Sequence, residues 1–201
     1  MVSTRQRHRS KAERREELIA AAIDIASDQG LDRLTVRDVA KRAEVTSGLI
    51  HHYFPSIDSL VTEAFRRIAT TDLEWLHDGL DKLEPHRAVR VFFERSIDPC
   101  RDPALAIWLS AWLAASRRAG LRDAAHEMMN SGVAALASIL RRGAEAGIFR
   151  CVDPEMSAQR ILTVADGFLI QRALKIGDVE RLGLASFVKQ TMEREIQIDL
   201  S

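Results

Sequence analysis

Cysteine is scarce in this sequence, and so are the motifs that mark common catalytic sites. The only two cysteines among 201 residues, Cys100 and Cys151, match no metal-binding or redox spacing and are typical of free thiols in a cytosolic protein. The sequence has no Gly-x-Ser-x-Gly, phosphate-binding loop, Cys-x-x-Cys or His-Glu-x-x-His motif. Adjacent residues on a helix, such as His51 and His52, diverge by about 100° and do not easily share one ion. We therefore expect no enzyme activity, no cofactor and no metal site.

Long apolar runs are also missing. The most apolar stretch, residues 104–115, is shorter than the ~20 residues that cross a bilayer. No apolar run follows the basic residues 5–11, as it would in a secretory signal. These absences predict a cytoplasmic protein with no membrane partner.

Net charge is absent, because 29 basic and 29 acidic residues cancel. Bulk charge therefore does not hold this protein on nucleic acid. The distribution is uneven, however, since residues 1–15 contain six Lys or Arg and one acid, Glu13. Such a basic arm suits phosphates or a minor groove. The alternative is a tail that only keeps the protein in solution.

Aromatic residues and prolines are few, and both shortages favour helices. The chain is 46% hydrophobic but only 5% aromatic, and it has five prolines. This composition predicts an all-α protein with ample material for a core. Apolar spacing, with Pro and Gly at the boundaries, predicts helices over residues 11–28, 57–80, 86–97, 103–119, 121–146, 154–176 and 179–196, and two short ones within 35–54.

The two short helical patterns stand back to back. The first begins after Thr35, a capping residue that Asp38 supports three positions later, and the second begins at Thr46. Their apolar sides are formed by Val36, Val39, Ala40 and Ala43, and by Leu49, Ile50, Tyr53 and Phe54. Only three residues join them, so the helices must cross steeply, which is typical of a helix-turn-helix. The alternative is an ordinary helix hairpin with a polar outer face.

The second short helix, residues 46–53, has the polar surface that a recognition helix needs. Small polar residues occupy its first turn and His51, His52 and Tyr53 its last. We expect Ser47, His51 and His52 to reach base edges. We expect Thr46 and Tyr53 to bind phosphates, and Gly48 to let the backbone approach DNA closely.

Residues 45–56, followed by Leu60, resemble the DNA-binding signature of the TetR family of bacterial repressors. The residues Gly30, Thr35, Val39, Ala40, Ala43 and Val45 fit the same pattern. The resemblance covers about residues 14–62 and adds Arg14, Thr35 and Arg37 to the candidates that bind double-stranded DNA. It departs from the family at Glu44, where Gly is frequent, and at Ile57, where a Lys commonly meets a phosphate. It implies a three-helix DNA-binding domain, residues 1–55, joined to a roughly six-helix ligand-binding and dimerisation domain, residues 56–201.

The second part of the chain resembles the choline-responsive, BetI-like branch of that family. The resemblance rests on residues 111–118, 140–143, 147–149 and 165–168. Trp108 and Trp112 lie four residues apart and share a helix face. Together with the aromatic residues Trp75, Phe92, Phe93 and Phe168 they form a candidate effector pocket, with Asp166 as counter-charge for an amine or quaternary ammonium. An apolar effector, or aromatic residues that simply fill the core, are the alternatives.

Residues 154–176 are apolar almost all round, and the last predicted helix shares this property. Two such helices predict a four-helix interface between two copies of the chain, although a buried monomer core is the alternative. The interface candidates are Ile161, Ala165, Phe168, Leu169, Phe187 and Val188. The sequence thus predicts a homodimeric repressor that a small-molecule effector releases from a palindromic operator. A helical carrier would bind ligand without a DNA sequence preference, and an architectural protein would bend DNA without a pocket.

Overall fold

The fold is entirely helical in the part of the chain that the structure describes. A computed structural model describes residues 10–176, 178, 181 and 183–197, and these residues form nine α-helices, three 3-10 helices and no strand, which confirms the all-α prediction. The α-helices are α1 (Lys11–Gln29), α2 (Val36–Arg42), α3 (Ser47–Tyr53), α4 (Ile57–His77), α5 (Pro85–Ser96), α6 (Asp102–Ala115), α7 (Ala119–Glu145), α8 (Pro154–Ala173) and α9 (Leu184–Ile196). The 3-10 helices are η1 (Leu31–Arg33), η2 (Leu80–Lys82) and η3 (Pro99–Arg101).

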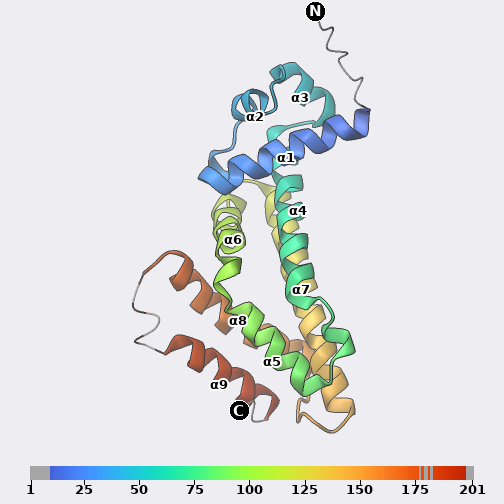
Figure 1. Cartoon of the computed structure of the whole chain (residues 1–201), viewed down its shortest axis with the longest axis vertical. Helices are drawn as coiled ribbons and strands as arrows, with labels where there is room; N and C mark the ends of the chain where they lie inside the picture. The colour runs from blue at the N-terminus through green and yellow to red at the C-terminus, as the bar shows by residue number, and fades with distance from the viewer. Residues whose placement is uncertain (1–9, 177, 179–180, 182, 198–201) are drawn as a thin grey trace, which may run out of the picture.

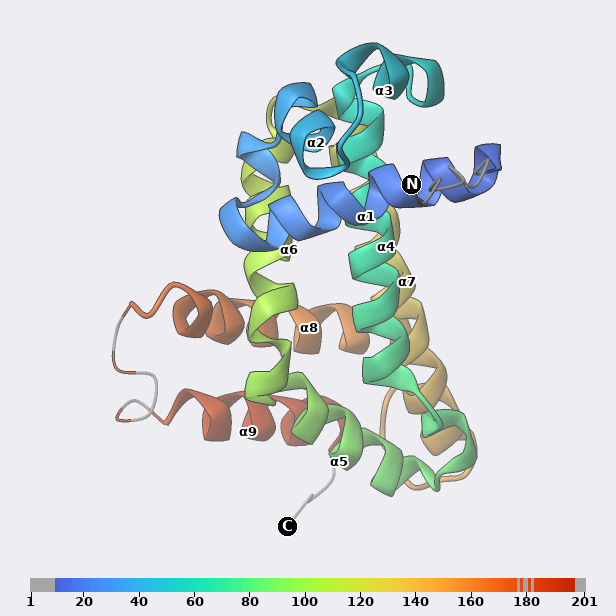
Figure 2. The same ribbon diagram turned by 45° about the horizontal axis from the view of Figure 1, so that its top comes forward.

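Helices α1, α2 and α3 gather at one end of the molecule, where α1 lies across the ends of α4 and α6 (Figure 1). Helices α4 and α7 run side by side away from this end and pack on each other extensively. Helices α8 and α9 form a hairpin on the other half, and the tilted view shows them side by side (Figure 2). The helix α4 therefore connects the α1–α3 end with the rest of the chain.

Two hydrophobic clusters fill the interior. The first joins α1, α2 and α3 to the start of α4, the later part of α6 and the start of α7. The second joins α5, α8, α9 and the later part of α7. Because Phe54 and Leu60 belong to the same cluster, the first core is continuous across residue 55.

The predicted helix ends are mostly close to the observed ones, and the differences have local causes. Helix α4 ends at His77 rather than near Leu80, because Gly79 adopts a left-handed conformation with φ 69° and starts η2. Gly147, also left-handed, follows the end of α7 as predicted. Gly120 was expected at a helix end but lies in the first turn of α7, and Gly177 lies outside the described residues.

Candidate nucleic-acid interface and effector cavity

A tight left-handed turn joins α2 to α3. The N–H of Val45 donates to the carbonyl of Ala40 (2.9 Å), and the N–H of Glu44 donates to that of Lys41 (3.4 Å). This pattern is the Schellman motif, which usually places Gly at the residue with positive φ. Here Glu44 occupies that position with φ 53°. The replacement therefore keeps the turn but adds strain of roughly 1–2 kcal/mol, since a side chain crowds the left-handed backbone.

Helix α3 buries one face and exposes the other. Ile50 and Phe54 are almost fully buried in the first core and anchor the helix. The opposite face exposes Thr46, Ser47, Gly48, His51 and His52. The hydroxyl of Thr46 makes no capping hydrogen bond, and Gly48 has no neighbour within 4 Å of where a Cβ would lie. These groups are therefore open to an external partner.

Tyr53 and Thr35 make contacts within the protein, although both were predicted to bind DNA. Tyr53 is half-buried, packs against the first core and meets the ring of His52 edge-on at 5.3 Å. The hydroxyl of Thr35 accepts from the Asp38 N–H (3.2 Å) and donates to the Asp38 carboxylate (2.5 Å). The carboxylate thus meets the capping hydroxyl, whereas a capping box would direct it to the backbone N–H of Thr35.

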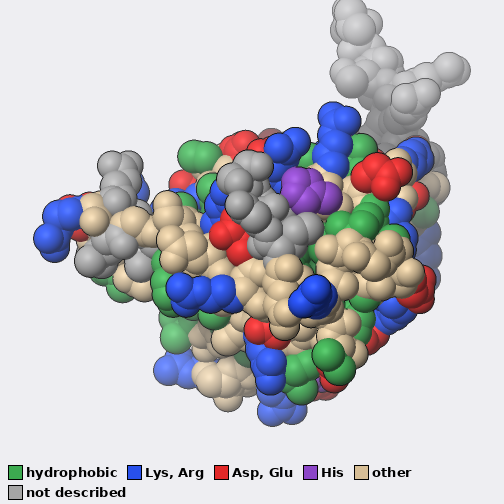
Figure 3. All heavy atoms as spheres, turned by 90° about the horizontal axis from the view of Figure 1, so that it is seen from below, with side chains coloured by type: hydrophobic (Ala, Val, Ile, Leu, Met, Phe, Trp, Pro, Cys, Tyr) green, Lys and Arg blue, Asp and Glu red, His purple; other side chains and the backbone are tan. Residues whose placement is uncertain are grey.

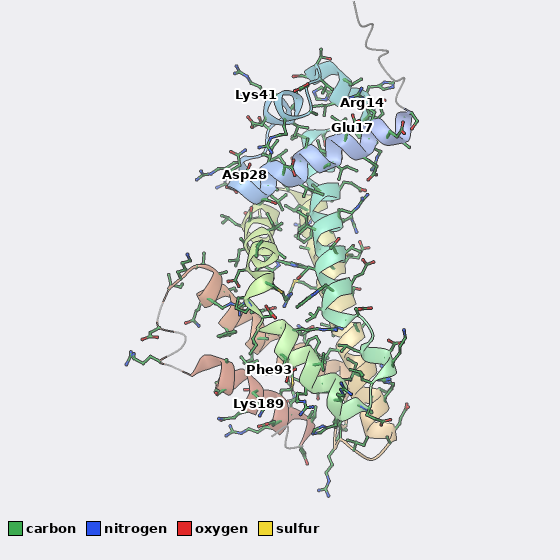
Figure 4. The ribbon with its side chains drawn as sticks, viewed as in Figure 1. Arg14, Glu17, Asp28, Lys41, Phe93 and Lys189 are labelled. Carbon is green, nitrogen blue, oxygen red and sulfur yellow. The ribbon has the colours of Figure 1, made fainter. Side chains whose placement is uncertain are left out.

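The basic residues at this end have different surroundings. Arg37 is exposed on α2, whereas Arg14 on α1 is partly buried and forms an ion pair with Glu17 at 2.7 Å. The basic residues 1–9 lie outside the described part of the chain. Lys41 was not among the predicted contacts, but it is exposed in the last turn of α2 and projects from the end that carries α3 (Figure 4). Its position directly after the apolar residues of α2 is the sequence signal that would have placed it among the predicted DNA contacts.

The end of the molecule away from α3 carries charges of both signs among the residues that the structure describes. Viewed from below, Lys and Arg side chains are interspersed with Asp and Glu among the coloured residues of that face (Figure 3).

Ile57, which stands where the family commonly has Lys, is used for packing. Its side chain is partly buried and packs against the first core at the start of α4. Arg15 of α1 lies over the Phe54 ring at 5.1 Å and reaches Glu63 of α4 at 3.4 Å. These contacts hold α1, α3 and α4 together. Ile57 itself packs inward and cannot make the phosphate contact that a Lys at this position commonly makes in the family.

A partly open cavity lies between α4, α6, α7 and α8. Its volume is about 80 Å³. It is lined by Leu73, Leu76, Ser96, Arg101, Leu105, Trp108, Leu109, Trp112, Met129, Val133, Gln159, Leu162, Ala165, Asp166, Leu169 and Ile170. Of the seven predicted effector-binding residues, the structure brings together Trp108, Trp112 and Asp166 here.

A buried ion pair reaches this cavity through Arg101, which lines it. Two nitrogens of Arg101 donate to the two carboxylate oxygens of Asp72 (2.9 and 2.8 Å), and Trp108 Nε1 donates to the same carboxylate at 3.1 Å. A third Arg101 nitrogen donates to the Ser96 carbonyl at 3.2 Å. Such a pair tolerates burial only because hydrogen bonds satisfy both charges. It fixes Trp108 of α6 against Asp72 of α4.

Asp166 and Trp112 bring two polar side chains to the cavity. Burial raises the pKa of Asp166 to about 6, and the nearby charge of Arg101 lowers it only partly. The buried Trp112 Nε1 has no hydrogen-bond partner. A buried donor left unpaired costs about 1–3 kcal/mol. These two groups therefore favour the binding of a ligand that carries a positive charge and a hydrogen-bond acceptor.

The other four predicted effector residues lie elsewhere, which corrects the expected pocket. Phe92, Phe93 and Phe168 are buried in the second core, and Phe93 lies on α5 in the half away from α3 (Figure 4). Phe92 stacks on His77 at 5.4 Å, where burial lowers the pKa of His77 to about 4. Trp75 is 40% exposed and lines a separate groove. Phe92 and Phe93 lie outside the cavity because their helix, α5, packs on α7.

Most of the predicted dimer contacts are buried within the single chain. Ile161, Ala165, Phe168, Leu169 and Val188 are each no more than 7% exposed, because α8 packs on both α7 and α9. These five residues lie beneath the surface of α8 and α9, so they would not contact a second copy directly. Phe187 is 53% exposed, and Leu174 of the α8–α9 connection is equally exposed. Apolar surface for a partner is therefore found at this end of the hairpin.

Within residues 10–176, 178, 181 and 183–197, no three His, Cys, Asp or Glu side chains are grouped so that they could hold a metal ion. In the same part of the chain, no helix has the length and apolar character needed to cross a membrane.

Comparisons with known proteins agree with this arrangement. Residues 18–64 match the model of the family described as bacterial regulatory proteins, tetR family, and residues 85–197 match the BetI-type transcriptional repressor C-terminal family. The regulator BetI 1 of Chromohalobacter salexigens is 30% identical over 118 residues, which span 54% of this chain and 56% of that relative. The regulator YfiR of Bacillus subtilis is 27% identical over 94% of this chain and 95% of its own.

A solved structure shares the fold over most of its length. The transcriptional regulator from Saccharomonospora viridis in complex with choline is 21% identical, with a TM-score of 0.75 over 92% of this chain and 98% of that chain. The BetI-type match alone covers more than half of the sequence. The chain therefore belongs to the TetR family of bacterial regulatory proteins, with a C-terminal domain of the BetI type.

Proposed function

We propose that the protein is a ligand-responsive transcriptional repressor that binds a palindromic operator as a homodimer in the cytoplasm. The observation that carries this proposal is the exposed polar face of α3, held by buried Ile50 and Phe54 and joined to α2 by the tight turn. A recognition helix requires such a face, because it must enter the major groove while its other side stays packed. Residues 1–55 are the proposed DNA-binding unit, and residues 56–201 bind the effector and the second copy.

The roles of the α3 residues follow from their exposure. Ser47, His51 and His52 are exposed side chains that can reach base edges, and Thr46 has a free hydroxyl for a phosphate. Tyr53, which is half-buried, positions the helix and presents its hydroxyl at the edge. Arg14, Thr35, Arg37 and the basic arm add phosphate contacts, and Lys41 joins them.

A second copy supplies the two-fold symmetry that a palindrome requires. The exposed Phe187 and Leu174 provide apolar surface beside α8 and α9. Gly167 lies in the middle of α8, is exposed and has no neighbour within 4 Å of where a Cβ would lie. Glycine costs a helix about 1 kcal/mol relative to Ala. The close approach of a helix of the second copy would account for a glycine at this position.

The cavity between α4, α6, α7 and α8 binds the effector in this proposal. A volume of about 80 Å³ corresponds to roughly five to eight water-sized positions, because one such position needs ~10–15 Å³. This size suits a small amine or quaternary ammonium and excludes a long acyl chain. The Trp108 and Trp112 rings offer faces to a cation, and Asp166 offers the counter-charge. The choline complex of the Saccharomonospora viridis protein supports this ligand class.

Effector binding is coupled to DNA through α4 and α6. Both helices line the cavity, and α1 lies across their ends. An effector that binds one arrangement of these helices better than another shifts the spacing of the two recognition helices, and such coupling amounts to about 1–3 kcal/mol.

The decisive experiment selects operator DNA from a random library and then titrates the complex with tetramethylammonium and choline. We expect a palindromic consensus, one dimer per site, and a 5- to 150-fold weaker DNA affinity with the effective cation. DNA bound without a consensus would instead indicate an architectural protein. A cation bound without any DNA preference would indicate a carrier.

A further inference from the structure

A second hollow lies on the outside of the helix pair that lines the effector cavity. It is a groove between α1, α4 and the η3–α6 segment, with a volume of about 470 Å³. It is lined by Ile23, Ser27, Arg67, Ile68, Thr71, Asp72, Trp75, Cys100, Arg101, Pro103, Ala104 and Ile107. It is therefore a place where one small molecule would touch both α1 and the two helices of the effector cavity.

Five of the polar side chains that line the groove, those of Ser27, Arg67, Thr71, Asp72 and Arg101, have partners within the chain. Ser27 and Thr71 donate their hydroxyl protons to carbonyls of their own helices, those of Ile23 and Arg67. The guanidinium of Arg67 binds both carboxylate oxygens of Glu16 at 2.9 and 3.3 Å. Asp72 and Arg101 neutralise each other. The groove therefore presents no uncompensated charge, and its open walls are apolar.

Size distinguishes this groove from the effector cavity. Its volume of about 470 Å³ lies within the ~300–1,000 Å³ of sites for drug-sized ligands, whereas the cavity of about 80 Å³ does not. The indole of Trp75, 40% exposed, forms one end and has the Arg95 guanidinium 5.9 Å from its centre. An exposed indole beside isoleucine side chains favours stacking with a flat ring.

We propose that this groove is a second ligand site, which takes an uncharged aromatic molecule of drug size. The ligand stacks on Trp75 and covers Ile68 and Ile107. Its recognition rests on apolar contacts, because the hydroxyls of Ser27 and Thr71 and the guanidinium of Arg67 are engaged within the chain. This site does not depend on the proposed DNA-binding role, and among the described residues Arg101 is its one lining residue in common with the effector cavity.

The test uses N-phenyl-1-naphthylamine, an uncharged aromatic probe whose fluorescence rises in apolar sites. Cys100 is exposed at the groove, so its alkylation by iodoacetamide reports occupancy. Cys151 is half-buried in the second core and serves as the internal control. Alkylation of each thiol is followed by peptide mass spectrometry in the full-length protein. We expect saturating probe to slow alkylation of Cys100 at least about fivefold, because bound ligands are 70–90% buried, and to leave Cys151 unchanged.

A matched pair of variants locates the probe. Thr71 and Thr70 are adjacent, exposed residues of α4, and only Thr71 lines the groove. Thr71→Trp should weaken probe binding at least about tenfold, since the indole occupies the ligand's volume. Thr70→Trp should leave probe affinity within about twofold of wild type, which is the error of such a comparison. No fluorescence rise, no protection of Cys100, or equal affinities of the two variants would each overturn the proposal.

Discussion

The backbone N–H of Leu31 donates a hydrogen bond of 2.6 Å to Ser110 Oγ, which joins η1 to the middle of α6. Ser110 in turn donates to the Asp32 carboxylate at 3.4 Å. Gly30 is so close that a Cβ there would lie 2.9 Å from Ser110 Oγ. Helix α6 lines the effector cavity, so this contact ties the cavity directly to the end of α1.

Replacing Ser110 with Ala should weaken this connection. The Leu31 N–H loses its acceptor, so we expect the free energy of unfolding to fall by about 1–2 kcal/mol. The effect of the effector on DNA affinity should also shrink. Ser116→Ala removes a hydroxyl that bonds only within α6, to the Leu113 carbonyl, and is the matched control. Urea unfolding and DNA titrations with and without effector provide both readouts, and equal coupling in the two variants would contradict this role.

Glu44→Gly should stabilise the turn between α2 and α3. Removing the side chain at φ 53° relieves roughly 1–2 kcal/mol of strain. The greater conformational freedom of Gly in the unfolded chain offsets part of this gain. We expect a net gain of up to about 1 kcal/mol in urea unfolding. Glu44→Ala keeps the Cβ and should give no such gain. A lower stability of the Gly variant would show that the Glu44 side chain makes a compensating contact.

The residues of α3 should separate by role when binding to a randomised operator library is measured. Ser47→Ala and His52→Ala remove exposed hydrogen-bonding groups and should each relax preference at particular base pairs by about 1–3 kcal/mol. Tyr53→Phe should weaken binding to all sequences about equally, because its ring packs on the core and only the hydroxyl is lost. Uniform losses for Ser47 and His52 would mean that α3 reads DNA shape.

Asp166 should make stability depend on pH with a sign opposite to that of an ordinary carboxylate. Its pKa of about 6 in the folded protein exceeds the usual 3.8, so the folded state binds the proton more tightly and its stability falls as pH rises from about 4 to 6. At pH 7 this amounts to roughly 2–3 kcal/mol as an upper bound. Asp166→Asn should therefore be more stable than wild type at pH 7, and the difference should shrink toward pH 4.

The same variant tests the effector. Protonation below pH ~6 removes the counter-charge, so wild-type affinity for tetramethylammonium should fall as the pH is lowered through that value. Asp166→Asn should bind the cation weakly and without this pH dependence. Calorimetric titrations at pH 5 and pH 8 decide the point. A pH-dependent affinity in the variant would assign the dependence to another group.

Phe187→Glu should convert the dimer to a folded monomer. The side chain is 53% exposed within the chain, so the charge is tolerated by the monomer but not by an apolar interface. Phe168→Glu, by contrast, should unfold the protein, because Phe168 is buried in the second core. Leu113→Glu, at a 70% exposed position on α6, controls for the added charge. Sedimentation and circular dichroism separate these cases, and an unchanged Phe187→Glu dimer would place the interface elsewhere.

Much of the helix-turn-helix was predictable, because its determinants are close in sequence. The spacing of Ile50 and Phe54 identified the packed face of α3, and both are buried. The conformation of Glu44 was not predictable in detail, since it results from the crossing of α2 and α3. The packing of Ile57 likewise depends on α1, which lies far before it in the chain.

The sequence by itself determined the all-α class, the order of the helices and the polar face of α3, since these follow from hydrogen bonds and apolar periodicity within about four residues. Only the tertiary structure decided which aromatic residues share a cavity. It placed Trp108, Trp112 and Asp166 together and moved Phe92, Phe93 and Phe168 into the second core. It also paired Asp72 with Arg101 across 29 residues. The physical reason is that helix packing, not periodicity, sets which of several apolar faces meet, and a helix that is apolar all round leaves that choice open.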